Sequence, residues 1–200
     1  MTSNSRSFLI LHGWQNHRPV DHWEHWLANE LTARGHAVTY PQLPDPDHPD
    51  LVVWLDRLHA HLDALGHEHE RVVVCHSLAV PLWLHAAARG RARADRVLLV
   101  APPSDEVMAG YEDIAGFVGP GATAAHLRTA APVTRLVAAD DDPYCPGGAA
   151  KEYGIPLDLD TDVIQGGAHL DLDAGYGSWP SVLAWCLTPE VRLSARPTKA

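Results

Sequence analysis

The sequence predicts an α/β protein whose mostly parallel sheet is covered by helices on both faces. Two observations carry this prediction: short apolar runs typical of buried strands alternate with segments of helical periodicity, and no large insertion interrupts that alternation. The 200 residues, 46% of them hydrophobic, suffice for one full core. We therefore expect a single domain over residues 1–188 and a polar, flexible C-terminal tail over residues 189–200.

The expected elements follow one another along the chain. Residues 8–11 form a continuous apolar run that predicts a buried strand, and residues 23–33 carry apolar side chains at helical spacing until Gly35 ends the helix. Residues 104–131 are broken by glycine and proline and leave room for a small insertion only, so no large cap domain is expected. The other elements that the patterns predict are strands at 36–40, 72–75, 96–101, 133–139 and 159–164 and helices at 51–65 and 78–89.

Ser77 is the candidate nucleophile. It follows the apolar strand at residues 72–75 and precedes a helix, within the motif Cys-His-Ser-Leu-Ala. A sharp turn between strand and helix lifts a serine hydroxyl clear of the sheet when the residues two before and two after it are small. Cys75 and Ala79 are small, although neither is glycine. The alternative is a serine that only caps the following helix.

An acid and a base are expected downstream, because hydrolases built on such a turn carry them in the order serine, carboxylate, histidine. The strand at 133–139 breaks into Asp140-Asp141-Asp142-Pro143, and the last strand leads into a glycine-rich turn that ends at His169. Asp142 is favoured as the acid because Pro143 biases it to an extended conformation, while Asp140 and Asp141 remain alternatives.

These residue types predict acyl transfer. His169 would take the proton of Ser77 as the serine attacks a carbonyl, and Asp142 would orient the imidazole. The resulting oxyanion needs backbone N–H donors, for which we expect Leu78 and Trp14. The residues expected to contact substrate are His12, Gly13, Trp14, His76 and Trp179.

Other assignments for nearby residues carry less weight. His76 adjoins Ser77, but neighbouring side chains in such a turn point apart, so we expect it to pack beside the turn and not to act as the base. Asp171 and Asp173 are expected to cap a helix, and Cys75 to be a small buried packing residue.

Composition argues against several other classes of function. Fifteen basic and 25 acidic residues give a formal charge of −10, which opposes nucleic-acid binding. The three cysteines are widely spaced and include no CxxC, so neither a disulfide framework nor a thiolate zinc site is expected. Fourteen histidines include close pairs without zinc-binding context, and we expect them to be solvated and no metal to bind. No export or membrane segment is recognised, which predicts a cytoplasmic protein.

The chain resembles the small serine hydrolases related to retinoblastoma-binding protein nine, within the α/β-hydrolase superfamily. The resemblance rests on five segments: Leu11-His-Gly-Trp-Gln-Asn16 with Asp21-His-Trp23, Cys75-His-Ser-Leu78, Asp141-Asp-Pro143, Gly167-Ala-His169, and Gly175-Tyr-Gly-Ser-Trp-Pro180.

The resemblance implies a compact α/β-hydrolase fold without a large cap, hydrolysis of esters or related acyl compounds, no cofactor, and a triad of Ser77, Asp142 and His169. The chain departs from the family at Cys75, Ala79 and Ala168, where glycines are usual. It has no Leu-x-Cys-x-Glu motif, so binding to the retinoblastoma protein is not implied.

The leading hypothesis is therefore a serine hydrolase, carboxylesterase-like, that acts on a small-molecule acyl substrate. A catalytically silent protein with a binding or regulatory role is the main alternative. A transferase or haloperoxidase-like activity that uses the same triad is a third. The sequence indicates neither the natural substrate nor the oligomeric state.

Overall fold

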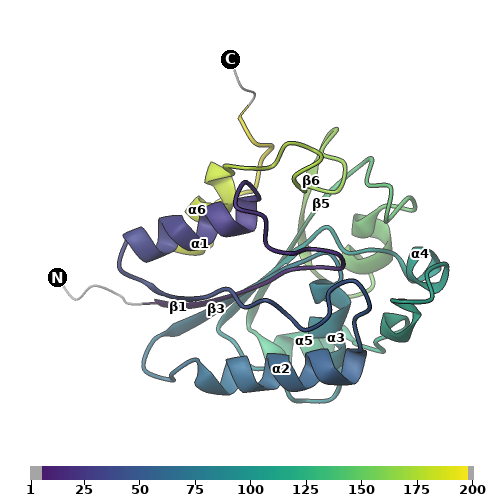
Figure 1. Cartoon of the computed structure of the whole chain (residues 1–200), viewed down its shortest axis with the longest axis horizontal. Helices are drawn as coiled ribbons and strands as arrows, with labels where there is room; N and C mark the ends of the chain where they lie inside the picture. Colours follow the sequence, from purple (N-terminus) through teal and green to yellow (C-terminus); the bar gives the residue numbers. More distant parts are fainter. Residues whose placement is uncertain (1–5, 198–200) are drawn as a thin grey trace.

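A computed structural model describes residues 6–197 and shows one six-stranded sheet between two layers of helices (Figure 1). The strand order is β2-β1-β3-β4-β5-β6, and every neighbouring pair is parallel. The strands are β1 (Arg6–Leu11), β2 (Ala37–Thr39), β3 (Glu70–His76), β4 (Arg96–Val100), β5 (Val133–Ala139) and β6 (Asp160–Ile164). The predicted α/β class, with a parallel sheet, is confirmed.

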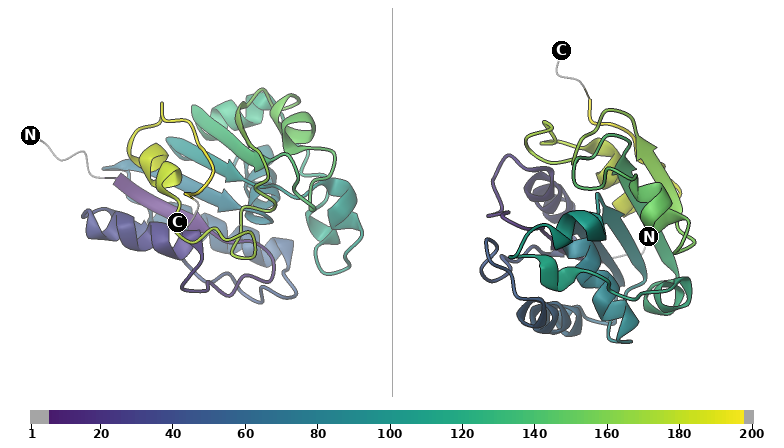
Figure 2. Two further views of the ribbon diagram at one scale, coloured as in Figure 1. Left: turned by 90° about the horizontal axis from the view of Figure 1, so that it is seen from above. Right: turned by 90° about the vertical axis from the view of Figure 1, so that its right-hand side faces the viewer.

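Helices cover both faces of the sheet, as the sequence predicts. On one face lie α1 (Trp23–Ala33) and α6 (Pro180–Leu187), and on the other lie α2 (Leu51–Ala64), α3 (Ala79–Ala88) and α5 (Ala124–Ala130) (Figures 1 and 2). Between β4 and α5 the chain forms only α4 (Asp105–Ala109) and the 3₁₀ turn η1 (Ala115–Phe117), so no large cap domain is present there. Within residues 6–197 no helix is long and apolar enough to cross a membrane.

Five short helical elements escaped prediction. Three of them, α4, η1 and α5, lie within residues 104–131, which were expected only to hold a small insertion. The fourth is the π-helical turn η2 (Ala150–Gly154) between β5 and β6. The fifth is α6, whose eight residues are almost all apolar and so show no helical stripe, although Pro180 occupies its first turn, where proline is well tolerated. The second strand is also shorter than expected, at three residues.

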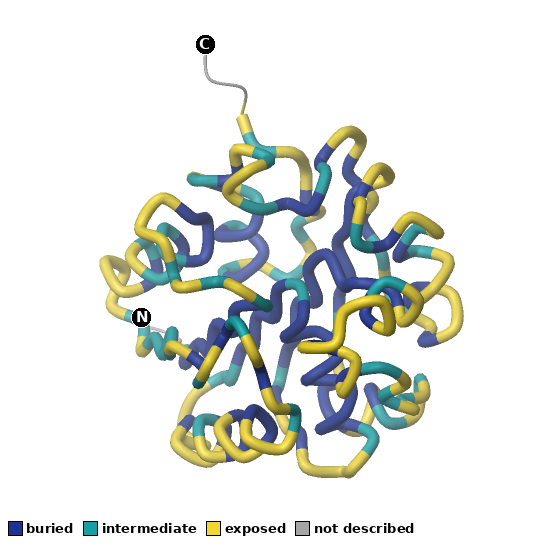
Figure 3. The backbone as a smooth tube through the Cα atoms, turned by 45° about the vertical axis from the view of Figure 1, so that its right-hand side comes forward, coloured by how far each residue is buried: buried dark blue, intermediate teal, exposed yellow. Residues whose placement is uncertain are grey.

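The core consists of two apolar layers, one on each face of the sheet. The central strands β1, β3, β4 and β5 are buried along most of their length, which is why they contain apolar runs in the sequence (Figure 3). Trp54 and Trp83 fill the layer beneath α2 and α3, and Trp23, Trp179 and Trp185 fill the layer beneath α1 and α6. Packing on both faces therefore fixes the strand ends at one edge of the sheet, where the site residues gather.

The C-terminal segment differs from the predicted flexible tail. Leu193 is buried, and its N–H donates to Asp162 of β6 at 3.0 Å. Arg192 forms ion pairs with Asp160 and Asp162 at 2.6 and 2.7 Å. The prediction is wrong for residues 189–197, because a polar sequence can dock through its charges and backbone as well as through apolar area. Residues 198–200 of the predicted tail lie outside the described residues.

Candidate active site

Ser77 lies in the sharp turn between β3 and α3, as predicted. Its φ of +54° falls in the left-handed region that residues other than glycine rarely adopt, and its N–H donates to the carbonyl of Val100 at 2.9 Å. Cys75 and Ala79, on either side, are fully buried. The turn therefore keeps its strained shape with two small non-glycine residues where glycines are usual.

His169 joins Ser77 to Asp142 in one line of hydrogen bonds. Its Nε2 lies 2.8 Å from the Ser77 hydroxyl, and its Nδ1 lies 2.9 and 3.0 Å from the two carboxylate oxygens of Asp142. The Asp142 side chain is almost completely buried, and its Oδ1 also accepts the N–H of Tyr144 at 2.9 Å. The structure thus places a hydroxyl, an imidazole and a carboxylate, 92 and 27 residues apart in the chain, in hydrogen-bonding contact.

The two aspartates that the sequence left as alternatives have a different position. Asp140 accepts the N–H of Gly166 at 2.9 Å, and Asp141 accepts the N–H of Ala168 at 2.8 Å. All three consecutive carboxylates therefore contact the loop that carries His169, but only Asp142 reaches its ring. Asp140 and Asp141 hold the backbone of the loop.

The loop around His169 is strained and is anchored from two further elements. Ala168 and Leu170 have φ angles of +46° and +50°, so the alanine found where a glycine is usual adopts the conformation that glycine prefers. The indole of Trp23 donates to the Leu170 carbonyl at 2.8 Å, and His76 Nε2 donates to the His169 carbonyl at 3.1 Å. Burial holds the pKa of His76 well below its usual value, so its ring is neutral. His76 packs beside the turn, as predicted, and does not contact Ser77 as a base.

Two backbone N–H groups are free near the nucleophile. Those of Trp14 and Leu78, the predicted oxyanion donors, make no hydrogen bond to any other described residue. Gly13 brings the first of these loops against the nucleophile: a Cβ on Gly13 would lie 2.6 Å from the Cβ of Ser77 and 3.0 Å from its hydroxyl. Only glycine allows this approach.

An open pocket of about 450 Å³ lies over Ser77 and His169. Of the predicted substrate contacts, Gly13, Trp14 and His76 line it. Its apolar lining comes from Trp14, Pro19, Pro103, Ile114, Tyr144 and Leu172, and its polar lining includes Asn16, His17, His22, Asp171 and Asp173. No lysine or arginine among the described residues contributes to this lining.

Two predicted substrate contacts lie elsewhere. Trp179 is fully buried, with its ring edge-on to Trp23 and its indole donating to Ser194. His12 is also fully buried, and its Nε2 accepts the N–H of Leu43 at 2.8 Å. Both predictions are wrong for the same reason: residues next to a catalytic loop in sequence can point into the core beneath it.

His12 makes the fold sensitive to acid. Burial lowers its pKa to about 4, so protonation costs more in the folded state than in the unfolded chain, where the pKa is about 6.5. Its contribution to stability is therefore complete above pH 6.5 and is lost as the pH falls toward 4, by about 3 kcal/mol in total. We expect His12→Gln, whose amide oxygen can still accept from Leu43, to show a shallower loss of unfolding free energy between pH 7 and pH 4.5. Urea unfolding measures this, and identical pH profiles for the two proteins would contradict it.

The sequence missed several residues that line the pocket. His22 was expected to be solvated, but it is buried at the pocket floor, and burial lowers its pKa to about 4. His59, on α2, is buried as well, so the general expectation of solvated histidines is wrong at both positions.

The Tyr144 ring lies 4.4 Å from the ring of His169. Asp171 caps a turn through Ala174, not a helix. The sequence offered one signal that His22 lies at the site: it belongs to the Asp21-His-Trp23 segment on which the family resemblance rests.

The chain is similar to known proteins over most of its length. A profile of a family described as serine hydrolases matches residues 8–187. YdeN of Bacillus subtilis (strain 168) is 26% identical over 181 residues, covering 89% of this chain and 93% of YdeN.

Solved structures share the fold. The structure of the ydeN gene product from B. subtilis has a TM-score of 0.79 at 24% identity and covers 92% of this chain and 97% of its own. A structure from the work on LipS and LipT, two metagenome-derived lipolytic enzymes, has a TM-score of 0.69 at 13% identity, covering 92% and 93%. Est1E from Butyrivibrio proteoclasticus, with ferulic acid bound, has a TM-score of 0.63 at 14% identity, covering 84% and 83%.

Proposed function

The chain belongs to the serine hydrolase family, with the α/β-hydrolase fold, and from this premise we propose that it cleaves carboxylic esters of small or medium acyl groups. The observation that carries the proposal is the line of hydrogen bonds from Ser77 through His169 to Asp142. Lipolytic enzymes among the structural neighbours support the ester class.

In the proposed reaction, the Ser77 hydroxyl attacks the ester carbonyl while His169 Nε2 takes its proton. The Asp142 carboxylate accepts the Nδ1–H and stabilises the imidazolium that forms. The N–H groups of Trp14 and Leu78 receive the tetrahedral oxyanion. Neither N–H group donates to another described residue. No existing hydrogen bond therefore has to break when negative charge develops on the substrate oxygen.

Collapse of the tetrahedral intermediate releases the alcohol, which takes the proton from His169, and leaves an acyl group on Ser77. Water then attacks the acyl-enzyme, with His169 again acting as the base. When the second tetrahedral intermediate collapses, the bond between the acyl group and Ser77 breaks, His169 returns its proton to the serine oxygen, and the acid leaves. The proposed residues supply every proton transfer in this sequence, and we expect no cofactor.

The pocket lining suggests which esters fit. Trp14, Tyr144 and Leu172 offer apolar surface for an acyl chain, and the pocket is open to solvent. Asp171 and Asp173 add negative charge without a basic partner in the lining, so we expect neutral substrates to be preferred over anionic ones. The pocket volume of about 450 Å³ suits a small-molecule ester, and we propose such an ester as the substrate.

We also propose that the protein works in the cytoplasm. All three cysteines, Cys75, Cys145 and Cys186, are free and buried, which suits a reducing compartment. With a formal charge of −10, we expect neither nucleic acid nor an anionic membrane surface to be a partner.

Fluorophosphonate labelling followed by a panel of p-nitrophenyl esters tests the proposed function. We expect one label per chain, located on Ser77 by mass spectrometry of the peptide, and turnover of acetate through octanoate esters that exceeds turnover of anionic esters of similar size. A folded protein that neither labels nor cleaves any ester in the panel would instead favour the catalytically silent role.

A further inference from the structure

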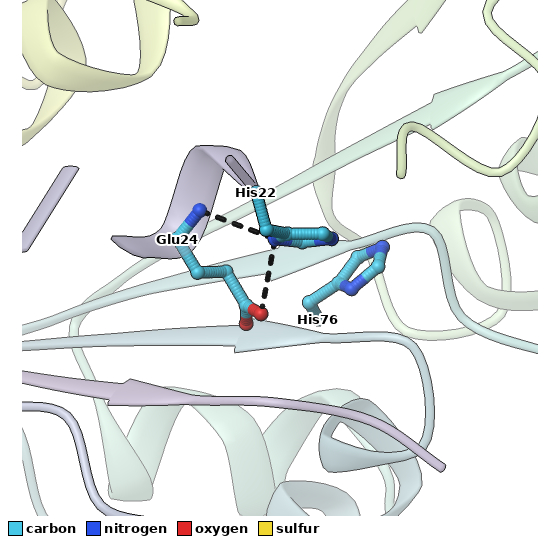
Figure 4. Close-up of side chains that lie close together, drawn as sticks. All are labelled: His22, Glu24 and His76. Atoms are coloured by element: carbon cyan, nitrogen blue, oxygen red, sulfur yellow. Dashed lines mark hydrogen bonds and ion pairs between the residues drawn. The ribbon is translucent and has the colours of Figure 1, made fainter. Parts of the chain in front are cut away.

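Three buried side chains converge beneath the floor of the pocket. His22 precedes α1, Glu24 lies in the first turn of α1, and His76 is the last residue of β3 (Figure 4). One ligand atom from each lies within 4.8 Å of the other two, and His22 Nδ1 is 3.3 Å from Glu24 Oε2. His22 Nδ1 also accepts the Glu24 N–H at 3.3 Å as the cap of α1, so a cation bound to this nitrogen would replace that hydrogen bond. Two elements remote in sequence thus bring two imidazoles and one carboxylate to a single point.

Two of the atoms at this point have no hydrogen-bond partner. They are Glu24 Oε1 and His76 Nδ1, which belong to side chains that are 0% and 3% exposed. A buried polar atom without a partner destabilises the folded state, and a buried charged group does so more strongly. A cation held between them would satisfy both atoms at once.

Other polar atoms of His76 and Glu24 make hydrogen bonds that hold these side chains in place. His76 donates its Nε2–H to the His169 carbonyl, which leaves Nδ1 as a lone pair directed toward the cluster. Glu24 Oε2 accepts from Asn16 at 3.0 Å and from the hydroxyl of Tyr40 at 3.1 Å. Metal-binding histidines and carboxylates in proteins are oriented in this way, by a hydrogen bond on the group that does not bind the metal.

We propose that His22, Glu24 and His76 form a binding site for a divalent transition-metal ion of the zinc class. Two neutral imidazoles and a carboxylate are the donor set that such ions favour. Bonds of about 2.0–2.2 Å bring tetrahedral ligands to roughly 3.3–3.5 Å from one another, so ligand atoms that now lie within 4.8 Å of one another would have to move closer together on binding.

The surrounding charges limit the affinity of the site. Burial raises the pKa of Glu24 to about 8, as expected for a carboxylate enclosed without a cation of its own. The Arg18 guanidinium stacks on Tyr40 at 4.6 Å and places a positive charge near Glu24. This charge opposes the binding of a cation at Glu24. We therefore expect weaker binding than at closed thiolate zinc sites.

A metal here would connect the helix layer to the catalytic loops. His76 adjoins Ser77 and supports the His169 carbonyl, and His22 is the N-cap of α1. Binding would lock the His76 ring in the tautomer that donates to the loop of His169. The ion would thus stabilise the site without contacting the reacting atoms.

Titration of the chelator-treated protein with Co²⁺, followed by visible absorption, tests the proposal. We expect one saturable equivalent with d–d bands, displacement by Zn²⁺, and a Zn²⁺-dependent rise in the unfolding temperature. Glu24→Gln keeps the size of the side chain and removes its charge, so it should weaken Co²⁺ binding at least tenfold, as should His22→Gln. Circular dichroism establishes that each variant is folded.

His69→Gln is the matched control, because His69 is exposed and lies far from the cluster in sequence. It should bind Co²⁺ like the wild type, whereas binding lost only in this variant would assign the ion to the surface. Wild-type protein without a saturable spectrum, or unchanged binding in both folded cluster variants, overturns the proposal. The readouts are metal binding and unfolding, so they do not depend on whether the protein cleaves esters.

Discussion

Ser77→Ala is expected to lower kcat for ester hydrolysis by about 10⁵- to 10⁶-fold, the largest effect of any single substitution in this protein. The variant loses the atom that forms the acyl bond, while the N–H groups of Trp14 and Leu78 still bind the carbonyl. Residual turnover therefore stays above that of water alone. Steady-state rates with p-nitrophenyl acetate and the loss of fluorophosphonate labelling measure the change.

Ser178→Ala is the control for this experiment. Ser178 is exposed and does not line the pocket, so its replacement should leave both rate and labelling unchanged. Because alanine fits the space of a serine, Ser77→Ala should unfold at nearly the wild-type temperature. Retention of a tenth or more of the activity by Ser77→Ala would rule out this residue as the nucleophile.

Asp142→Asn is expected to lower kcat by about 10⁴-fold with little change in substrate binding. The amide that replaces the carboxylate no longer stabilises a positive charge on His169, and it favours the wrong tautomer of that ring. Both carboxylate oxygens of Asp142 lie within 3.0 Å of His169 Nδ1, and no other carboxylate among the described residues is hydrogen-bonded to this ring. Single-turnover kinetics separates the loss of acylation from any change in binding.

Asp141→Asn provides a neighbouring comparison for that result. Its side-chain oxygen can still accept the N–H of Ala168, so the loop should keep its shape and activity should fall less than tenfold. Equal losses in the two variants would mean that the aspartate run acts only by holding the loop, and Asp142 would then have no separate role in catalysis.

Much of the fold and of the site was predictable because both follow from local patterns. The central strands lie between two helix layers, so each reads as an unbroken apolar run, and parallel strands bring their ends to one edge. Ser77 and Asp142 follow two of these strands, β3 and β5, whereas His169 follows the edge strand β6, which mixes aspartate and threonine with apolar residues. The proline after Asp142 was the feature that favoured it over the two carboxylates before it, and the structure agrees.

Side-chain direction was less predictable. His12 and Trp14 are two residues apart on one loop, yet the first points into the core and the second lines the pocket. Trp179 and His22 were misjudged in opposite directions, the first as a pocket residue and the second as a solvated one. Contacts across more than a hundred residues decide such cases: the indole of Trp23, for example, reaches the carbonyl of Leu170.

The segment that follows α6 has a consequence for how copies of this protein behave in solution. β6 is the outermost strand on its side, and Val163 exposes 52% of its surface there. An open strand edge is a template on which other chains can add. Arg192 and Leu193 engage the aspartates of β6 and so shield part of that template. We therefore expect this stretch, whose composition suggests a dispensable end, to limit self-association through the edge of β6.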